Sequence, residues 1–183
     1  MGRHRLRLVA GVVLLSGFVL SGLLLRGQAM QTTKPAGASA ALFAEIDRLL
    51  RLGPLTPASV GDATGMRLSA VPGESSEYFQ VYAGKGAAAR PFASAELRVP
   101  TAAAAKSAGE LLVLTLSPGQ KIGLSEVSAR YGKPGGLDVP QPDAPADEPV
   151  YHAYRLGKVK VSFGFTRSDP AVVVAVVIDR SAE

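Results

Sequence analysis

The sequence predicts an α+β fold, in which short helices pack on antiparallel β-meanders behind a separate N-terminal signal or transmembrane helix. Three observations lead to this prediction. The chain opens with arginines followed by a long uncharged apolar run. Further on, short segments repeat their apolar residues at helical spacing, and other segments, such as 92–99 and 158–165, alternate apolar with polar residues as β-strands do. The folded part should therefore combine helices with antiparallel strands.

Residues 1–26 have the pattern of a signal peptide or an N-terminal membrane anchor. Three arginines within the first seven positions precede the apolar run 8–25, which carries no charge. A helix of these 18 residues would be about 27 Å long, close to the ~30 Å hydrocarbon core of a bilayer. Small residues at Gly27 and Ala29 also suit signal cleavage. An uncleaved anchor and a cleaved signal are therefore both open.

The positive charge of the chain belongs to this leader. The formal net charge is +5, but four of the 20 Lys and Arg residues lie in positions 1–26, and the other 16 nearly balance the 15 acidic residues. The positive-inside rule keeps the N-terminus in the cytoplasm and puts the rest outside, in the periplasm or at the cell surface. A nearly neutral exported part makes no case for nucleic acid. The absence of cysteine excludes disulfides and thiolate metal sites.

After the leader we expect a linker and one folded domain. Residues 27–41 are small and polar without an apolar period, which predicts a flexible linker. Residues 42–183 are long enough to bury a core of their own as one extracytoplasmic domain.

Helical spacing predicts three helices in this domain. The first covers residues 42–51 and ends before a Gly-Pro pair. The second follows Thr56 as its N-cap and ends near Gly65, and the third has Ser125 as its N-cap and ends at Tyr131.

Alternation and β-branched or aromatic content predict the strands. The last three should form an antiparallel meander with a tight turn at Gly157, and the proline-rich segment 134–149 should be a long loop. Residues 83–86 (Ala-Gly-Lys-Gly) carry a turn signal. The predicted strands are 66–71, 77–82, 92–99, 111–116, 150–156, 158–165 and 171–178.

The two halves of the domain share one order of elements. Residues 55–99 and 122–178 each begin with a short helix and a glycine and end with three strands. This order favours a duplicated helix-plus-meander unit, with a single unduplicated α+β domain as the alternative. The second half carries a Gly-Leu-Ser run at 123–125 and a Tyr-Gly-Lys-Pro run at 131–134, before three strands. In this it resembles the small lipoprotein family of the outer-membrane barrel-assembly machinery. The tandem-repeat β-lactamase inhibitor protein has a similar architecture. The resemblance implies helices packed on a meander.

No recognisable motif for catalysis, a cofactor or a metal ion is present in the sequence. His152 is the single histidine after the leader and suits a structural or surface position. The Gly-Lys-Gly run at 84–86 lacks the rest of a phosphate loop. Asp143, Asp147 and Glu148 lack the alternating ligands and central glycine of a calcium loop. We therefore predict a protein that is not an enzyme and takes no cofactor.

The leading functional prediction is a non-enzymatic envelope protein that binds another envelope protein. It would be tethered to the membrane through residues 8–25, or secreted after cleavage. The alternative is a secreted or periplasmic enzyme inhibitor or immunity protein, which the tandem-repeat resemblance motivates. Exposed aromatic residues favour protein interfaces. The candidate surface combines aromatic strand residues with acidic loop residues: Tyr78, Tyr82, Tyr151, Tyr154, Asp143, Asp147 and Glu148.

Overall fold

The computed structural model describes residues 37–105 and 108–181, all of which belong to a unit spanning Lys34–Glu183. The predicted leader, residues 1–26, and the linker up to residue 36 lie outside the described residues, so the signal and anchor predictions stay predictions. Among the described residues, no helix is long and apolar enough to cross a membrane.

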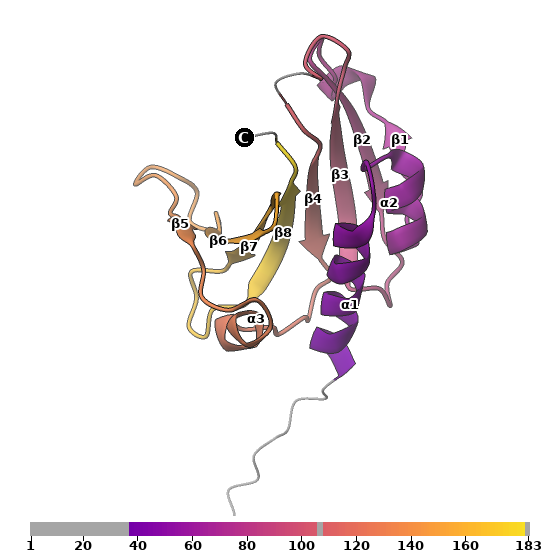
Figure 1. Ribbon diagram of the computed structural model, residues 1–183. Coiled ribbons are helices and arrows are strands. Elements are labelled where there is room, and N and C mark those ends of the chain that lie inside the picture. The colour runs from indigo at the N-terminus through magenta and orange to yellow at the C-terminus, as the bar shows by residue number, and fades with distance from the viewer. Residues whose placement is uncertain (1–36, 106–107, 182–183) are drawn as a thin grey trace, which may run out of the picture. The chain divides into compact units, whose positions relative to one another are not determined.

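An eight-stranded antiparallel sheet and three α-helices make up the described part, so the fold is α+β (Figure 1). The strands lie in the order β1-β2-β3-β4-β8-β7-β6-β5, and every neighbouring pair is antiparallel. The elements are α1 (Gly37–Arg51), α2 (Pro57–Thr64), β1 (Ser69–Ala70), the 3-10 helix η1 (Pro72–Glu74), β2 (Phe79–Lys85), β3 (Phe92–Pro100), β4 (Leu111–Leu116), α3 (Leu124–Tyr131), β5 (Gly136–Asp138), β6 (Val150–Leu156), β7 (Val159–Phe165) and β8 (Val173–Asp179).

The strand order is symmetric about the central β4–β8 pair. On each side of this pair the strands follow chain order from the sheet edge to the centre. Helices α1 and α2 precede the first set of four strands, and α3 precedes the second. The first set reaches beyond the predicted half 55–99, because it includes β4. The predicted meander of the last three strands is confirmed, with Gly157 at φ 65° in its tight turn.

One face of the sheet carries the hydrophobic core. The strand register places Leu97, Leu112, Ile178 and Val161 side by side across four strands, and each is fully buried. Burying such a side chain contributes roughly 1.5–3 kcal/mol. Helix α1 adds its own buried stripe at helical spacing, which consists of Leu42, Ile46 and Leu49.

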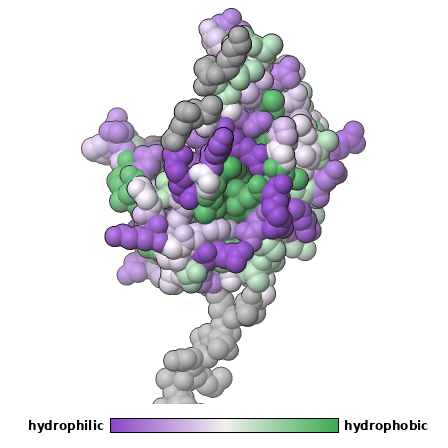
Figure 2. All heavy atoms as spheres, viewed as in Figure 1, coloured by the Kyte–Doolittle hydropathy of each residue, from purple (hydrophilic) through white to green (hydrophobic). Residues whose placement is uncertain are grey.

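The core stays partly open at its margin. Phe43, Leu50, Tyr131 and Leu156 pack against the core cluster but are only partly buried. Figure 2 shows hydrophobic residues gathered in the middle of the viewed side, with hydrophilic residues around them.

Local signals explain where the helices begin and end. Thr56 caps α2 by accepting a hydrogen bond from the Ser59 backbone N–H at 3.1 Å, and Gly65 ends α2 at φ 70°, as predicted. The N-cap of α3 is Gly123 instead of the predicted Ser125, because the Glu126 carboxylate accepts the Gly123 N–H at 3.0 Å.

Three other expectations need correction. Helix α1 begins at Gly37, so the alanine-rich residues 37–41 are helical and not linker. The predicted strand 66–71 is reduced to the two residues of β1. The predicted loop 134–149 contains β5, which pairs with β6.

The predicted turn at residues 83–86 is also wrong, because β2 continues through Lys85. Gly84 is needed because the backbone at Arg67 packs closely against it: a Cβ at Gly84 would lie 2.8 Å from the Arg67 carbonyl oxygen.

Candidate interaction surface

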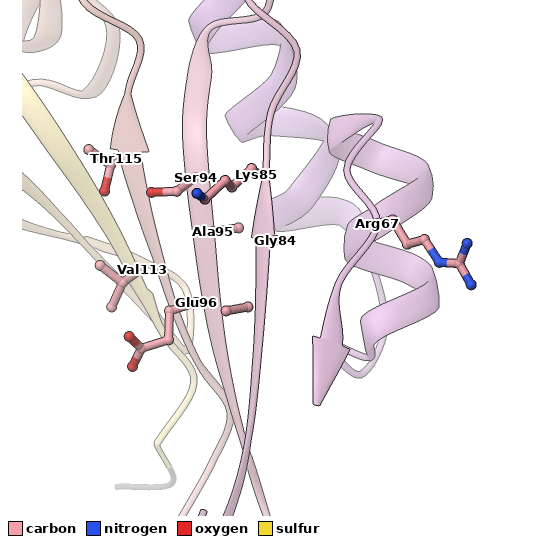
Figure 3. Close-up of a pocket in the computed structure, with 9 residues that line it drawn as sticks. Arg67, Gly84, Lys85, Ser94, Ala95, Glu96, Val113 and Thr115 are labelled. Atoms are coloured by element: carbon pink, nitrogen blue, oxygen red, sulfur yellow. The ribbon is translucent and has the colours of Figure 1, made fainter. Parts of the chain in front are cut away.

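The sheet has a second face, opposite the core, which we call the open face. Side chains alternate between the two faces along each strand. In β4, Leu112 and Leu114 are buried in the core, whereas Val113 and Thr115 point to the other side and keep solvent contact. Figure 3 shows Val113, Thr115 and Glu96 on this side of strands β3 and β4. The open face is therefore a regular surface that the described helices do not use for their buried side chains.

Register divides the open face into three rows, each of which crosses the sheet from strand to strand. The charged row consists of Val81, Arg98, Leu111, Asp179, Lys160 and Arg155, of which Val81 is buried. The apolar row consists of Ala83, Glu96, Val113, Val177, Ser162 and Ala153. The hydroxyl row consists of Lys85, Ser94, Thr115, Ala175, Gly164 and Tyr151.

Ion pairs organise the charged row. Lys160 Nζ lies 3.8 Å from Asp179 Oδ2, and Arg98 reaches out of its row to Glu96 at 2.8 Å. Burial tends to raise the pKa of Asp179, but hydrogen bonds from Ser181 and the nearby cations outweigh it and lower that pKa below its usual value. Exposed pairs of this kind contribute about 0–1 kcal/mol to stability. They therefore shape the charge of the surface more than they stabilise the fold.

The open face is hollowed on both sides of its centre. The larger hollow, about 450 Å³, lies over β2, β3 and β4 (Figure 3). Two smaller hollows, about 230 Å³ and 130 Å³, lie on the side of β6 and β7 and share Arg155 and Lys160. The lining of the large hollow includes Ala83, Lys85, Ser94, Glu96, Val113 and Thr115.

The structure separates the aromatic residues that the sequence singled out. Tyr154 is 2% exposed and packs in the core, so its place on an exposed surface was wrong. Tyr82 packs partly buried against the same core, and Tyr78 is exposed just before β2. Tyr151 lies on the open face over Gly164. Strands β3, β4, β8 and β7 separate Tyr78 and Tyr82 from Tyr151.

The acidic candidates occupy the segment between β5 and β6. Asp143, Asp147 and Glu148 are all exposed there. Burial raises the pKa of Tyr151, and the charges of Glu148 and Asp138 raise it further. The three exposed acidic candidates lie in the segment that leads into β6, the strand that carries Tyr151.

His152 and the acidic side chains of the described residues do not gather into a metal site. No group of three or more His, Cys, Asp or Glu side chains within them could hold a metal ion. His152 packs edge-on against the Phe165 ring, with centroids 5.0 Å apart. The open face offers hydroxyls, ion pairs and apolar contacts.

Most of this surface could not be predicted from the sequence. Val113 and Thr115 belong to a run of almost only apolar residues, in which a period of two is hard to see. Lys85 was assigned to a turn. Only the pairing of β2, β3 and β4 shows that Val113, Thr115 and Lys85 share one face of the sheet.

No protein-family model, curated protein or solved structure matches this chain. The resemblance of residues 122–178 to the barrel-assembly lipoprotein family therefore stays a prediction, and the open face is interpreted from its own geometry.

Proposed function

We propose that this chain is a non-enzymatic, exported protein-interaction module, and that another envelope protein binds the open face of its sheet. The observation that carries the proposal is the layout of this face. Val113 and Val177 are paired across the two central strands and remain partly exposed. A charged row and a hydroxyl row lie on either side of them. An apolar centre within a polar rim is the usual anatomy of a protein interface.

The size of the face supports a protein partner. Six strands spaced about 4.8 Å apart span roughly 24 Å, which is wider than a small ligand needs. Membrane attachment through residues 8–25, or release after cleavage, completes the proposal and rests on the sequence pattern of the leader.

The symmetric strand order favours a duplicated helix-plus-strands unit, extended by β4 in the first half. The same symmetry supports an alternative function, a periplasmic inhibitor or immunity protein that captures an enzyme on the open face. Retention of the chain in membranes after an alkaline carbonate wash supports the tethered module and counts against a free inhibitor.

The test is affinity purification of the tagged full chain from detergent-solubilised envelopes. We expect Val177→Arg to lower recovery of the wild-type partner about tenfold or more, because it puts a charge in the apolar centre. Val139→Arg is the matched control, since Val139 is 56% exposed and lies just beyond β5, outside the three rows. Circular dichroism melts check that both variants fold.

Equal recovery of the partner by wild type and Val177→Arg would overturn the proposal. So would a folded chain that captures nothing reproducibly but hydrolyses a member of a substrate panel.

A further inference from the structure

We propose that the large hollow of the open face receives a carboxylate side chain of the bound partner, with Lys85 as its counter-ion. The inference rests on the proposed function and names the chemistry of one contact within it. Lys85, Ser94 and Thr115 occupy matching register positions on three adjacent strands, and all three line the hollow. Figure 3 shows the Lys85 ammonium close to Ser94, with Thr115 beyond it on the same side.

The side chains of Lys85, Ser94 and Thr115 offer hydrogen-bond donors that a bound acceptor group could use. An ammonium offers three donors and no acceptor, and each hydroxyl can donate one hydrogen bond. Lys85 is exposed and makes no ion pair with any residue in the described ranges. A carboxylate is the protein group that accepts from several donors at once and neutralises an ammonium.

Glu96, the one carboxylate among the described residues that line the hollow, is already engaged. Glu96 Oε1 accepts from Arg98 Nε at 2.8 Å, and the Arg98 guanidinium balances its charge. Lys85 therefore keeps its positive charge uncompensated at the other end of the hollow. A partner that buries this face has to supply an anion or leave a desolvated cation, which is costly.

The walls of the hollow favour a side chain over a free anion. Ala83 and Val113 give apolar contacts for the methylene stem of Glu or Asp. Val113 also pairs with Val177 of the apolar row, so the hollow opens directly onto the centre of the proposed interface. A residue inserted here would belong to the same partner surface that covers the valines.

Arg67 gives a matched control. It borders the hollow and carries the same charge as Lys85, but Figure 3 shows its guanidinium directed away from the strands that form the hollow. Loss of general positive charge affects both variants, whereas a carboxylate site depends on Lys85 alone.

The first experiment repeats the affinity purification with Lys85→Gln and Arg67→Gln full chains. We expect Lys85→Gln to lower partner recovery about tenfold, and Arg67→Gln to leave it unchanged. Val177→Arg separates the two proposals. Loss of capture by Val177→Arg with full capture by Lys85→Gln overturns the carboxylate site and leaves the interaction surface standing, whereas full capture by both overturns the interaction surface itself.

The second experiment needs no partner and uses N-acetylglutamate amide as the probe. Titrated into the ¹⁵N-labelled full chain in detergent, it should shift the backbone amide signals of Ser94 and Thr115. The neutral N-acetylglutamine amide should not, and Lys85→Gln should abolish the shifts. Equal shifts with both probes overturn the site. Much tighter binding of free succinate than of N-acetylglutamate amide would place a small anion there instead, which also overturns the proposal.

Discussion

The two halves of the sheet share one strand order but present different open faces. In the half built from β1 to β4, Lys85 has no acidic partner among the described residues and lines a hollow of about 450 Å³. In the half built from β5 to β8, Lys160 is paired with Asp179 at 3.8 Å, and Tyr151 lies over Gly164. The hollows there are about 230 Å³ and 130 Å³. Among the described residues, the same strand order thus carries an unpaired lysine on the open face of the first half and an ion-paired lysine on the open face of the second half.

The helix side shows a second contrast, because α1 is fastened to the two halves by different chemistry. Towards the first half, the buried Glu45 carboxylate lies 3.5 Å from the Arg90 guanidinium. Towards the second half, Asp47 pairs with Arg130 of α3, and Phe43 packs edge-on against Tyr131 at 5.7 Å. Helix α1 therefore links the halves, and changes to either attachment test whether they are independent.

The largest expected effect tests whether the halves unfold together. Phe163 and Phe92 are both fully buried, one in each half, and Phe163 packs against the rings of Tyr131 and Tyr154 at 5.4 and 5.7 Å. We expect Phe163→Ala and Phe92→Ala each to lower the free energy of unfolding by about 3–5 kcal/mol. Because β4 and β8 join the halves into one sheet, both variants should still unfold in a single transition.

Urea unfolding followed by circular dichroism, and separately by tyrosine fluorescence, measures this. If Phe163→Ala unfolds in two steps while Phe92→Ala unfolds in one, the halves are separate cooperative units, and the comparison becomes one between two domains.

The elements that the sequence predicted well are those fixed by neighbouring residues. The cap Thr56 and the stop at Gly65 act within a few positions, so α2 could be predicted from its ends. Strand β5 could not, because its three residues form a strand only by pairing with β6. Gly84 is a residue type typical of turns, but it lies inside β2, where the absence of a side chain lets the Arg67 backbone approach.

The candidate site was predicted less well than the fold, and for a related reason. Tyr151 and Tyr154 stand three positions apart on one strand, so they point to opposite faces. The sequence prediction placed both on one surface, and only the packing of the sheet separates them: Tyr154 is buried in the core and Tyr151 lies on the open face. Thr115 sits in an apolar run and lines the site only because register puts it beside Ser94. Sites built across several strands depend on tertiary pairing.

A smaller effect is expected where α1 meets the end of β8. The Arg180 guanidinium donates to the carbonyl oxygens of Leu49 at 3.2 Å and Leu52 at 3.1 Å, and to that of Gly53. It thereby satisfies the last turn of α1 from the centre of the sheet. Arg180→Ala should lower the free energy of unfolding by about 1–3 kcal/mol. Arg67→Ala, at an exposed position, should change it by less than about 0.5 kcal/mol.

The same urea series measures both variants, with Arg180→Lys as an intermediate case that keeps the charge but loses the planar fork. An Arg180→Ala chain as stable as Arg67→Ala would mean that α1 is held by its apolar stripe alone, and that its polar attachments do not distinguish the halves.

The smallest effect is a pH dependence of opposite sign at two carboxyl groups. Burial raises the pKa of Glu45 above its ordinary 4.5, against the opposing charges of Arg90 and Arg48. A raised folded-state pKa stabilises the fold fully below 4.5, and this contribution is lost as pH rises through the folded value. The lowered pKa of Asp179 acts the other way: its contribution is present above 3.8 and is lost as pH falls through the folded value.

Unfolding free energies measured on both sides of these pKa values separate the two groups. Glu45→Gln should remove part of the loss in unfolding free energy that occurs as pH rises. Asp179→Asn should remove part of the loss that occurs as pH falls. The two variants should therefore flatten opposite limbs of the wild-type curve. Flattening of the same limb by both variants would contradict the opposite directions of the two pKa shifts.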